Sequence, residues 1–174
     1  MFETTNQQTT ISNFKPAKEN HGDQKKLVGD IKVKMNVSNT VLDVLGNGLR
    51  AALYRKREKH EEPKQTELLL AINDGLTALK NPHLEPLSLD EKFPGYSAQF
   101  QSGLAVDDLV KLSDIVLSGF VIEAKDGGTV ELSFNMRCPI DRRIGGTLCA
   151  LIQESVEMTL IAPKAEEQQR DLAA

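Results

Sequence analysis

The sequence has few of the residue types that build stacking platforms and metal sites. Its 174 residues include no tryptophan, two tyrosines, two cysteines and three histidines. Scarce aromatic side chains leave few surfaces on which nucleic-acid bases could stack. No histidine has another histidine, a cysteine or an acidic residue at a spacing typical of a zinc site, so we expect no metal centre. Cys138 and Cys149 both lie in apolar segments and are predicted to be buried thiols rather than a disulfide.

Long apolar runs and export signals are also missing. The longest apolar run is only a few residues, so no membrane span is expected. The first residues, MFETTNQQTTISNF, have neither the basic region nor the apolar region of a signal peptide. These two absences predict a cytoplasmic protein.

Catalytic motifs are absent as well. The sequence contains no G-x-S-x-G, no P-loop and no H-E-x-x-H, and the Gly46–Gly48 segment is too short for a dinucleotide fingerprint. Asp107 and Asp108 precede an apolar segment, where helix capping explains them better than acid–base catalysis. We therefore expect a protein that is not an enzyme and that uses no cofactor.

Length and composition indicate one globular domain. Hydrophobic residues at 40% and charged residues at 26% are ordinary values for a folded chain, and 174 residues are enough for one core but hardly for two. Residues 1–29 are polar, with few apolar anchors beyond Phe14, Leu27 and Val28, and are predicted to form a flexible arm that docks at Phe14. Residues 30–163 are predicted to form the domain, and residues 164–174 a solvated tail.

Period-two alternation predicts most of the regular structure. Residues 29–38, GDIKVKMNVS, place Ile31, Val33, Met35 and Val37 on one face and the lysines on the other. Residues 113–140 contain two strand-like runs joined by KDGG, which is a hairpin signal. The inward residues of the second run are Val130, Leu132, Phe134, Met136 and Cys138. Residues 145–163 predict a short helix and a last strand with Val156, Met158 and Leu160 inward.

One principal helix is predicted after residue 38. Ser38 or Asn39 can cap its start, and Val41, Leu42, Leu45, Leu49 and Leu53 recur at helical spacing. Gly46 and Gly48 each weaken a helix by about 1 kcal/mol relative to alanine, so we expect a break or bend between them. The predicted fold class is therefore α+β: a mainly antiparallel sheet or sandwich with one principal helix and a short C-terminal helix.

Positive charge is concentrated in the first third of the chain. Residues 1–60 contain 11 Lys and Arg against 6 Asp and Glu, whereas residues 61–174 contain 10 against 19. The densest segment, LYRKREKH at 53–60, could simply complement the dipole at the C-terminal end of a helix. Together with Lys25 and Lys26 and the outward lysines of the preceding strand, it could instead form one basic surface for a nucleic-acid backbone or an acidic partner. The candidate contact residues are Lys32, Lys34, Arg50, Tyr54, Arg55, Lys56, Arg57 and Lys59, and both Tyr54 and Tyr96 are expected to be partly exposed.

Two further segments are candidate sites. Arg142 and Arg143 precede a Gly-Gly pair at a predicted helix start, where free N–H groups favour anions, although an ordinary glycine-containing loop explains the same residues. The chain ends in Leu172, Ala173 and Ala174 after a polar tail. This end resembles the bacterial tag that directs stalled products to an unfoldase and protease; an inert frayed end is the alternative.

Four segments together resemble a family of small early-region proteins of tailed phages and prophages. The segments are NFKPAKENHGD, DIKVKMNVSNTVLDVLGNGLRAALYRK, KDGGTVELSF and LCALIQESVEMTLIAP. The shared landmarks are Phe14, Pro16, Glu19, His21 and Gly22 before the first strand, then Leu49, Arg50, Leu53 and Tyr54. The resemblance covers roughly residues 13–162 and brings no catalytic residues. Gly-Asn-Gly stands where that family usually has a proline-containing bend.

Two classes of function fit these observations. The first is a non-enzymatic phage-type binding protein that contacts a host protein stoichiometrically, such as a defence or nuclease component, in the cytoplasm of a bacterial host cell. The second is a nucleic-acid-associated accessory protein of phage recombination or replication, bound to the backbone of single strands or duplex. A net charge of −4 and few stacking aromatics favour the first class. Both classes are compatible with a homo-oligomer.

Overall fold

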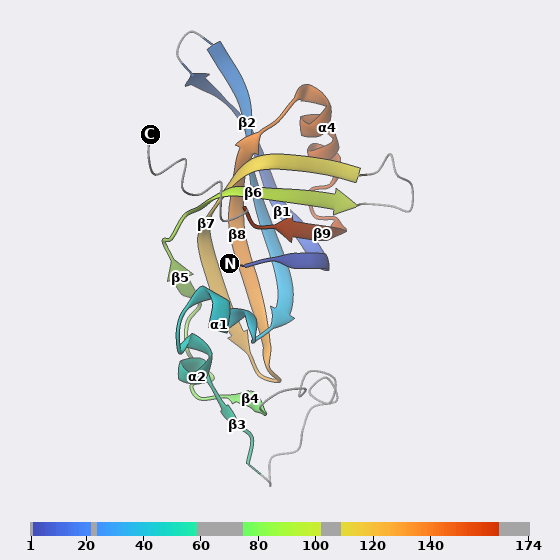
Figure 1. The fold of residues 1–174 in the computed structure, drawn as a ribbon. Coiled ribbons are helices and arrows are strands. Elements are labelled where there is room, and N and C mark those ends of the chain that lie inside the picture. The colour runs from blue at the N-terminus through green and yellow to red at the C-terminus, as the bar shows by residue number, and fades with distance from the viewer. Residues whose placement is uncertain (1, 22–23, 59–74, 102–108, 164–174) are drawn as a thin grey trace. The chain divides into compact units, whose positions relative to one another are not determined.

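The computed structural model describes residues 2–21, 24–58, 75–101 and 109–163 (Figure 1). Most of the regular structure in these ranges is β, and the helices are short. The strands are β1 (Thr4–His21), β2 (Gln24–Ser38), β3 (Tyr54–Lys56), β4 (Leu76–Leu79), β5 (Leu87–Leu89), β6 (Phe93–Gln101), β7 (Leu109–Lys125), β8 (Thr129–Pro139) and β9 (Ser155–Ile161). The helices are α1 (Val41–Leu45), α2 (Leu49–Leu53) and α4 (Arg142–Ala150).

Six strands form a closed antiparallel barrel. Their order is β7-β6-β9-β1-β2-β8, a pairing of β7 with β8 closes the ring, and β5 adds to β7. The pairs β1–β2, β1–β9, β6–β7 and β6–β9 are all antiparallel. The prediction of a mainly antiparallel sheet is confirmed. Closure is the feature that alternation alone did not reveal, since inward and outward positions alternate in an open sheet too.

The chain divides into two compact units. Unit 1 comprises Met1–Phe2, Asn36–Ser88 and Val121–Leu132. Unit 2 comprises Glu3–Met35, Leu89–Phe120 and Ser133–Ala174. These boundaries do not coincide with the expected limits of a single domain at residues 30 and 163.

The prediction of a flexible arm is wrong for residues 4–21 and 24–29, because these residues belong to β1 and β2. Strand β1 lies between β2 and β9 in the sheet. Its inward side chains include Ile11 and Phe14, three residues apart rather than two, because the register shifts between Ile11 and Asn13. This bulge hides the alternation that would have identified a strand.

The core of unit 2 is built from aromatic and branched side chains. Phe93 meets Phe120 edge to face with ring centroids 5.6 Å apart, and Phe120 stacks on Phe134 at 5.1 Å. Such geometries add to the stabilisation that burial of the rings already provides. Phe14, the predicted anchor, is buried, as predicted. The inward faces predicted for residues 130–138 and 156–160 are confirmed by burial of their apolar residues. The face predicted for residues 31–37 is confirmed at Ile31, Val33 and Met35, whereas Val37 is half-buried.

The predicted principal helix is replaced by two five-residue helices in unit 1. The expected break is confirmed: α1 ends at Leu45, and Gly48 adopts a positive φ of 75° before α2. Helix α2 ends at Leu53, however, and residues 54–56 pair antiparallel with β4. The N-cap position of α1 is Thr40 rather than Ser38 or Asn39, and the Thr40 side chain makes no capping hydrogen bond. Pairing with a distant strand outweighs the local helical spacing.

The C-terminal predictions hold in most respects. The hairpin at residues 125–128, helix α4 and strand β9 are all present. Both cysteines are free thiols; Cys138 is buried, as predicted, but Cys149 is exposed on α4. The apolar run of residues 66–72, TELLLAI, predicts a short buried strand, but this run and the pair Asp107–Asp108 lie outside the described residues. In the part of the chain that is described, no helix has the length and apolarity needed to cross a membrane.

Candidate functional site

The predicted contact residues fall into both units. Lys32 and Lys34 belong to unit 2, whereas residues 50–57 belong to unit 1. Lys59 lies outside the described residues. The prediction that all of them form one continuous basic surface therefore stays a prediction, and each group has its own environment.

The arginines of unit 1 are held by carboxylates of the same unit. Arg50 Nη1 donates to Asp43 Oδ2 at 3.1 Å. Arg57 Nη2 donates to both carboxylate oxygens of Asp126 at 3.1 Å. The side chains of Arg50 and Arg57 are only 11% and 17% exposed. An incoming anion would have to displace these ion pairs. The two arginines are therefore better suited to stabilising unit 1 than to binding a partner.

Tyr54 is buried, which corrects the expectation of partial exposure. Its hydroxyl lies 3.0 Å from the Lys125 carbonyl oxygen and 2.8 Å from that of Thr129, at the two ends of the β7–β8 turn. Burial raises the pKa of Tyr54 to about 12. Tyr96 is buried as well, and none of the phenylalanine or tyrosine side chains is exposed. No aromatic side chain of these two types therefore offers a stacking platform.

Two cations of the predicted unit 1 group remain on the surface. Lys56 is exposed at the end of β3, and Arg55 is half-buried with Nη1 donating to the Lys56 carbonyl oxygen at 3.2 Å. Two side chains are a small basis for an electrostatic interface. The predicted unit 1 cluster is thus largely an internal ion-pair network.

The outward face of β1 and β2 in unit 2 carries a denser group of cations. Residues that lie directly opposite one another in an antiparallel pair share a face. Three such pairs are Asn13 with Lys32, Lys15 with Asp30, and Glu19 with Lys26. Lys34 lies on the same face, two residues beyond Lys32. All four lysines are exposed.

Arg137 of β8 joins this face through the carboxylates of β1 and β2. Its Nη1 donates to both carboxylate oxygens of Asp30 at 2.6 Å, and its Nη2 donates to Glu19. Both sets of hydrogen bonds raise the pKa of Arg137, and the one with Glu19 contributes more than those with Asp30. The network connects three strands while leaving the Arg137 side chain 41% exposed.

We call this group the basic strand face and define it by its five cations, Lys15, Lys26, Lys32, Lys34 and Arg137. Two carboxylates, Glu19 and Asp30, lie among them. The face has a surplus of positive charge in a chain whose net charge is −4. Sequence reasoning found the two strand lysines and Lys26 but missed Lys15 and Arg137. The position of Lys15 directly after the predicted anchor Phe14 was a signal for it, whereas only the tertiary structure brings Arg137 to β1 and β2.

The arginine pair of α4 has a competing carboxylate. Asp141 caps the helix, and its Oδ1 accepts a hydrogen bond from the Ile144 backbone N–H at 2.7 Å. This carboxylate occupies the position that an external anion would take at the helix start. Arg142 and Arg143 are both exposed. The arrangement supports the alternative of an ordinary capped helix.

The C-terminal residues that resemble a degradation tag, Leu172, Ala173 and Ala174, lie outside the described residues. A role of this end as a degradation signal therefore remains a prediction. In the described ranges, no group of three or more histidine, cysteine or acidic side chains is placed to hold a metal ion.

Comparison of the chain with known protein families, with curated proteins and with solved structures found no match. The resemblance to phage early-region proteins therefore stays a prediction.

Proposed function

We propose that the protein is a non-enzymatic binding protein whose basic strand face holds an acidic surface of a partner protein in a stoichiometric complex. The observation that carries this proposal is the concentration of five cations on one face of three neighbouring strands, where the carboxylates of Glu19 and Asp30 lie among them. The strands hold these side chains at fixed spacing, so little backbone ordering is needed on binding. The partner class is a host-cell protein such as a defence or nuclease component.

The charge of the whole chain favours a protein over a long polyanion. At physiological ionic strength, charges more than about 8 Å apart are largely screened. An acidic patch of limited size on a partner protein would therefore interact mainly with the charges of the basic strand face. A long nucleic acid would also meet the rest of a chain whose net charge is −4. The buried tyrosines add no stacking energy for bases.

A nucleic-acid backbone is the second candidate partner. Lys32 and Lys34 project from one strand at a separation of about 7 Å, a regular array that suits repeated phosphates. Contacts of this kind position a protein on nucleic acid without reading its sequence. Such binding would be non-specific and strongly dependent on salt.

Charge reversal on the face separates these functions. The test variant carries Lys15→Glu and Lys32→Glu, and the matched control carries Lys18→Glu and Lys111→Glu, which change the same number of exposed lysines elsewhere in unit 2. The tagged full chain is purified at 50 mM salt from bacterial cells, with and without nuclease. We expect a 1:1 protein complex that survives nuclease, disappears in the test variant and persists in the control.

The remaining outcomes decide between the candidates. Nucleic acid retained by the wild type and the control but lost by the test variant would replace the first candidate with the second. A protein partner held equally by the wild type and both variants would show that the basic strand face is not the interface. Absence of any partner at 50 mM salt would overturn both functions.

A further inference from the structure

The connection between α1 and α2 exposes an asparagine that is followed by a glycine. Asn47 and Gly48 form this connection, and both are exposed. The Leu49 N–H donates to the Gly46 carbonyl oxygen at 3.1 Å, which closes a turn over the two residues. Gly48 has a φ of 75° and a ψ of 0°, the values that a type II turn requires at its third residue. The asparagine therefore lies in a tight turn that is surrounded by solvent.

The polar groups on either side of the Asn47–Gly48 peptide bond have no internal partner. None of the hydrogen bonds between described residues involves the Asn47 side-chain amide or the Gly48 N–H. A Cβ added to Gly48 would meet no atom beyond its chain neighbours within 4 Å, so the space beside this peptide is open to water. Glycine also lets the peptide plane turn at little steric cost. The side-chain carbonyl carbon and the Gly48 nitrogen can thus approach each other without breaking a hydrogen bond of their own.

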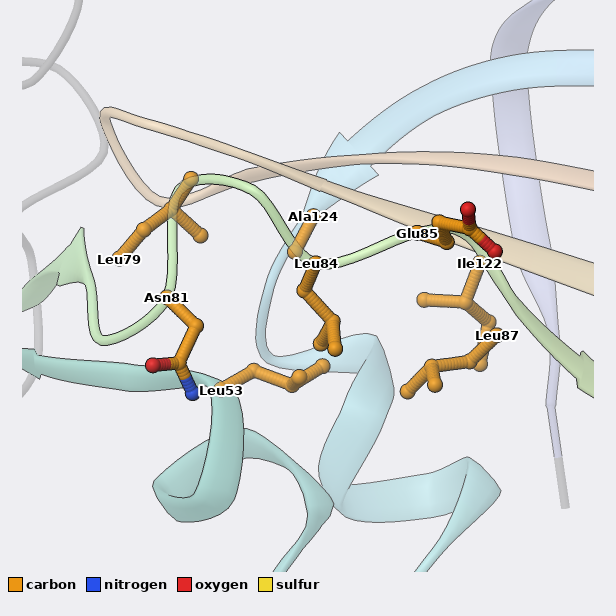
Figure 2. A pocket seen from close by; sticks show the side chains of 8 residues that line it. All are labelled: Leu53, Leu79, Asn81, Leu84, Glu85, Leu87, Ile122 and Ala124. Atoms are coloured by element: carbon orange, nitrogen blue, oxygen red, sulfur yellow. The ribbon is translucent and has the colours of Figure 1, made fainter.

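The two short helices are anchored on either side of this turn. Leu42 of α1 and Leu53, the last residue of α2, are both buried. Figure 2 shows Leu53 extending from α2 towards Leu84, beside a hollow of unit 1. The hollow has a volume of about 10 Å³, which is about the least that one water molecule needs, so protein atoms fill this region. The turn can therefore change its shape while both helices remain packed.

A second turn with an acidic residue before glycine is held in place. Asp126 precedes Gly127 in the β7–β8 turn, and Arg57 donates to both of its carboxylate oxygens at 3.1 Å. The Gly127 N–H donates to the Thr77 carbonyl oxygen at 3.0 Å. At this turn the side chain and the following nitrogen both have partners that they would have to leave before they could meet. The tertiary structure thus separates two turns that resemble each other in sequence.

We propose that Asn47 is a site of spontaneous deamidation, a covalent modification that needs only water and does not rest on the function proposed for the basic strand face. The Gly48 nitrogen gives its proton to a solvent base and forms a bond to Asn47 Cγ. The bond from Cγ to Nδ2 breaks, and Nδ2 takes up a proton and leaves as ammonia. The resulting succinimide ring adds a water molecule at either of its carbonyl carbons, which gives aspartate or isoaspartate at residue 47. Nothing is oxidised or reduced in these steps.

The modification changes both the charge and the backbone of the turn. Either product adds a carboxylate to unit 1, which changes the net charge of the chain from −4 to −5. Isoaspartate also inserts its Cβ into the backbone between Gly46 and Leu49, the residues that the turn hydrogen bond joins. This hydrogen bond should then be lost, and the amides at the start of α2 should exchange faster with solvent. The modified fraction rises with the age of the molecule, and an isoaspartyl carboxyl methyltransferase is the class of enzyme that recognises the product.

Incubation of the purified full chain at mildly alkaline pH tests the proposal. Peptide mass spectrometry should show that residue 47 gains the mass difference between an acid and its amide. An isoaspartyl carboxyl methyltransferase should label the incubated protein but not the fresh protein. The reaction should be faster at higher pH, because the attacking nitrogen must lose a proton. Asn47→Gln is the control, since its longer side chain closes a larger ring much more slowly, and it should give neither signal.

A matched variant separates the structure from the sequence pair. Asp126→Asn in the Asn47→Gln background places an asparagine before Gly127, whose N–H is bonded to Thr77. In the folded protein this asparagine should react roughly two- to tenfold more slowly than Asn47 of the wild type, the factor that one hydrogen bond is worth. In concentrated urea, which removes the structure, the two sites should react at similar rates. Lys15→Glu with Lys32→Glu should deamidate at the wild-type rate, so failure of the proposed function and failure of this inference are distinguishable.

Two results would overturn the inference. The first is an unchanged mass at residue 47 after an incubation that fully converts an unstructured Gly-Asn-Gly peptide. The second is an equal rate at residues 47 and 126 in the folded proteins, because the exposed turn would then have no advantage over the hydrogen-bonded one.

Discussion

The ring of Phe14 lies so close to Gly29 that a Cβ on residue 29 would be 2.8 Å from Phe14 Cε2. The same Cβ would lie 3.2 Å from Ile140 Cδ1. Phe14 belongs to β1 and Gly29 to β2, so this contact joins the segment once expected to be a flexible arm to the strand beside it. Glycine at this position allows an aromatic ring to be buried at close range.

Gly29→Ala should therefore destabilise the protein. Overpacking of this kind costs about 1–3 kcal/mol, which urea unfolding of wild type and variant would measure. Phe14→Leu in the Gly29→Ala background should recover part of the loss, because the smaller side chain relieves the clash. Additive effects of the two substitutions would show that residues 14 and 29 do not interact.

Deletion of residues 1–12 should abolish cooperative unfolding. The deletion removes every β1 residue that pairs with β9, from Thr4 to Thr10, together with the fully buried Ile11. The milder substitution Ile11→Ala should cost about 2–5 kcal/mol, whereas exposed Asn13→Ala should stay within about 0.5 kcal/mol of wild type. Thermal unfolding followed by circular dichroism provides the measurement. A deletion variant with the wild-type midpoint would show that β1 does not contribute to the barrel.

Tyr54→Phe should lower stability at neutral pH by about 0.5–1.5 kcal/mol, because the two carbonyl oxygens at the β7–β8 turn lose their hydroxyl donor. The pH dependence has a definite sign. Burial raises the pKa of Tyr54 from 10.0 to about 12, so the folded state retains a proton that the unfolded chain releases earlier. Its contribution is fully present below pH 10 and is lost as the pH rises towards 12.

The difference between wild type and Tyr54→Phe isolates the contribution of this hydroxyl, because all other groups are the same in the two proteins. The stability advantage of the wild type should shrink from pH 10 to pH 12, and urea midpoints at each pH would follow it. A constant difference across this window would indicate that Tyr54 does not titrate with a raised pKa.

Arg137→Ala should destabilise unit 2 modestly, by about 1 kcal/mol, since the ion pairs are roughly 40% exposed and solvent weakens them. The substitution also removes the guanidinium that Glu19 and Asp30 share, so the two carboxylates repel each other more strongly. Adding Glu19→Gln and Asp30→Asn should remove this repulsion and restore part of the stability. High salt should reduce the loss in Arg137→Ala, because it screens the two carboxylates. A loss that is the same at low and high salt would point to packing of the arginine stem instead.

Local chemistry was sufficient for several elements. The KDGG turn allows few backbone paths, and it forms the expected hairpin with Gly127 and Gly128 at positive φ. The alternation of residues 31–35 and 130–138 identified buried faces because each strand buries one side only. The break between α1 and α2 followed from glycine, whose effect on a helix is a property of the residue itself.

Other features depended on partners distant in the chain. Residues 54–56 form a strand because β4 pairs with them, although their sequence continues a helical pattern. Tyr54 is buried because its hydroxyl finds two carbonyl oxygens more than seventy residues away. The bulge of β1 shifted its alternation by one residue, and so the sequence alone suggested a polar arm.

The candidate binding face shows the same division. Lys32 and Lys34 could be assigned to a solvent-facing side from alternation, since their apolar neighbours Ile31 and Val33 had to be buried. Lys15 required the register of β1 on β2, and Arg137 required ion pairs to residues 107 and 118 positions away. Spacing along one strand is a local property that sequence expresses directly. The meeting of three strands is decided by the free energy of the whole barrel, which only the tertiary structure reveals.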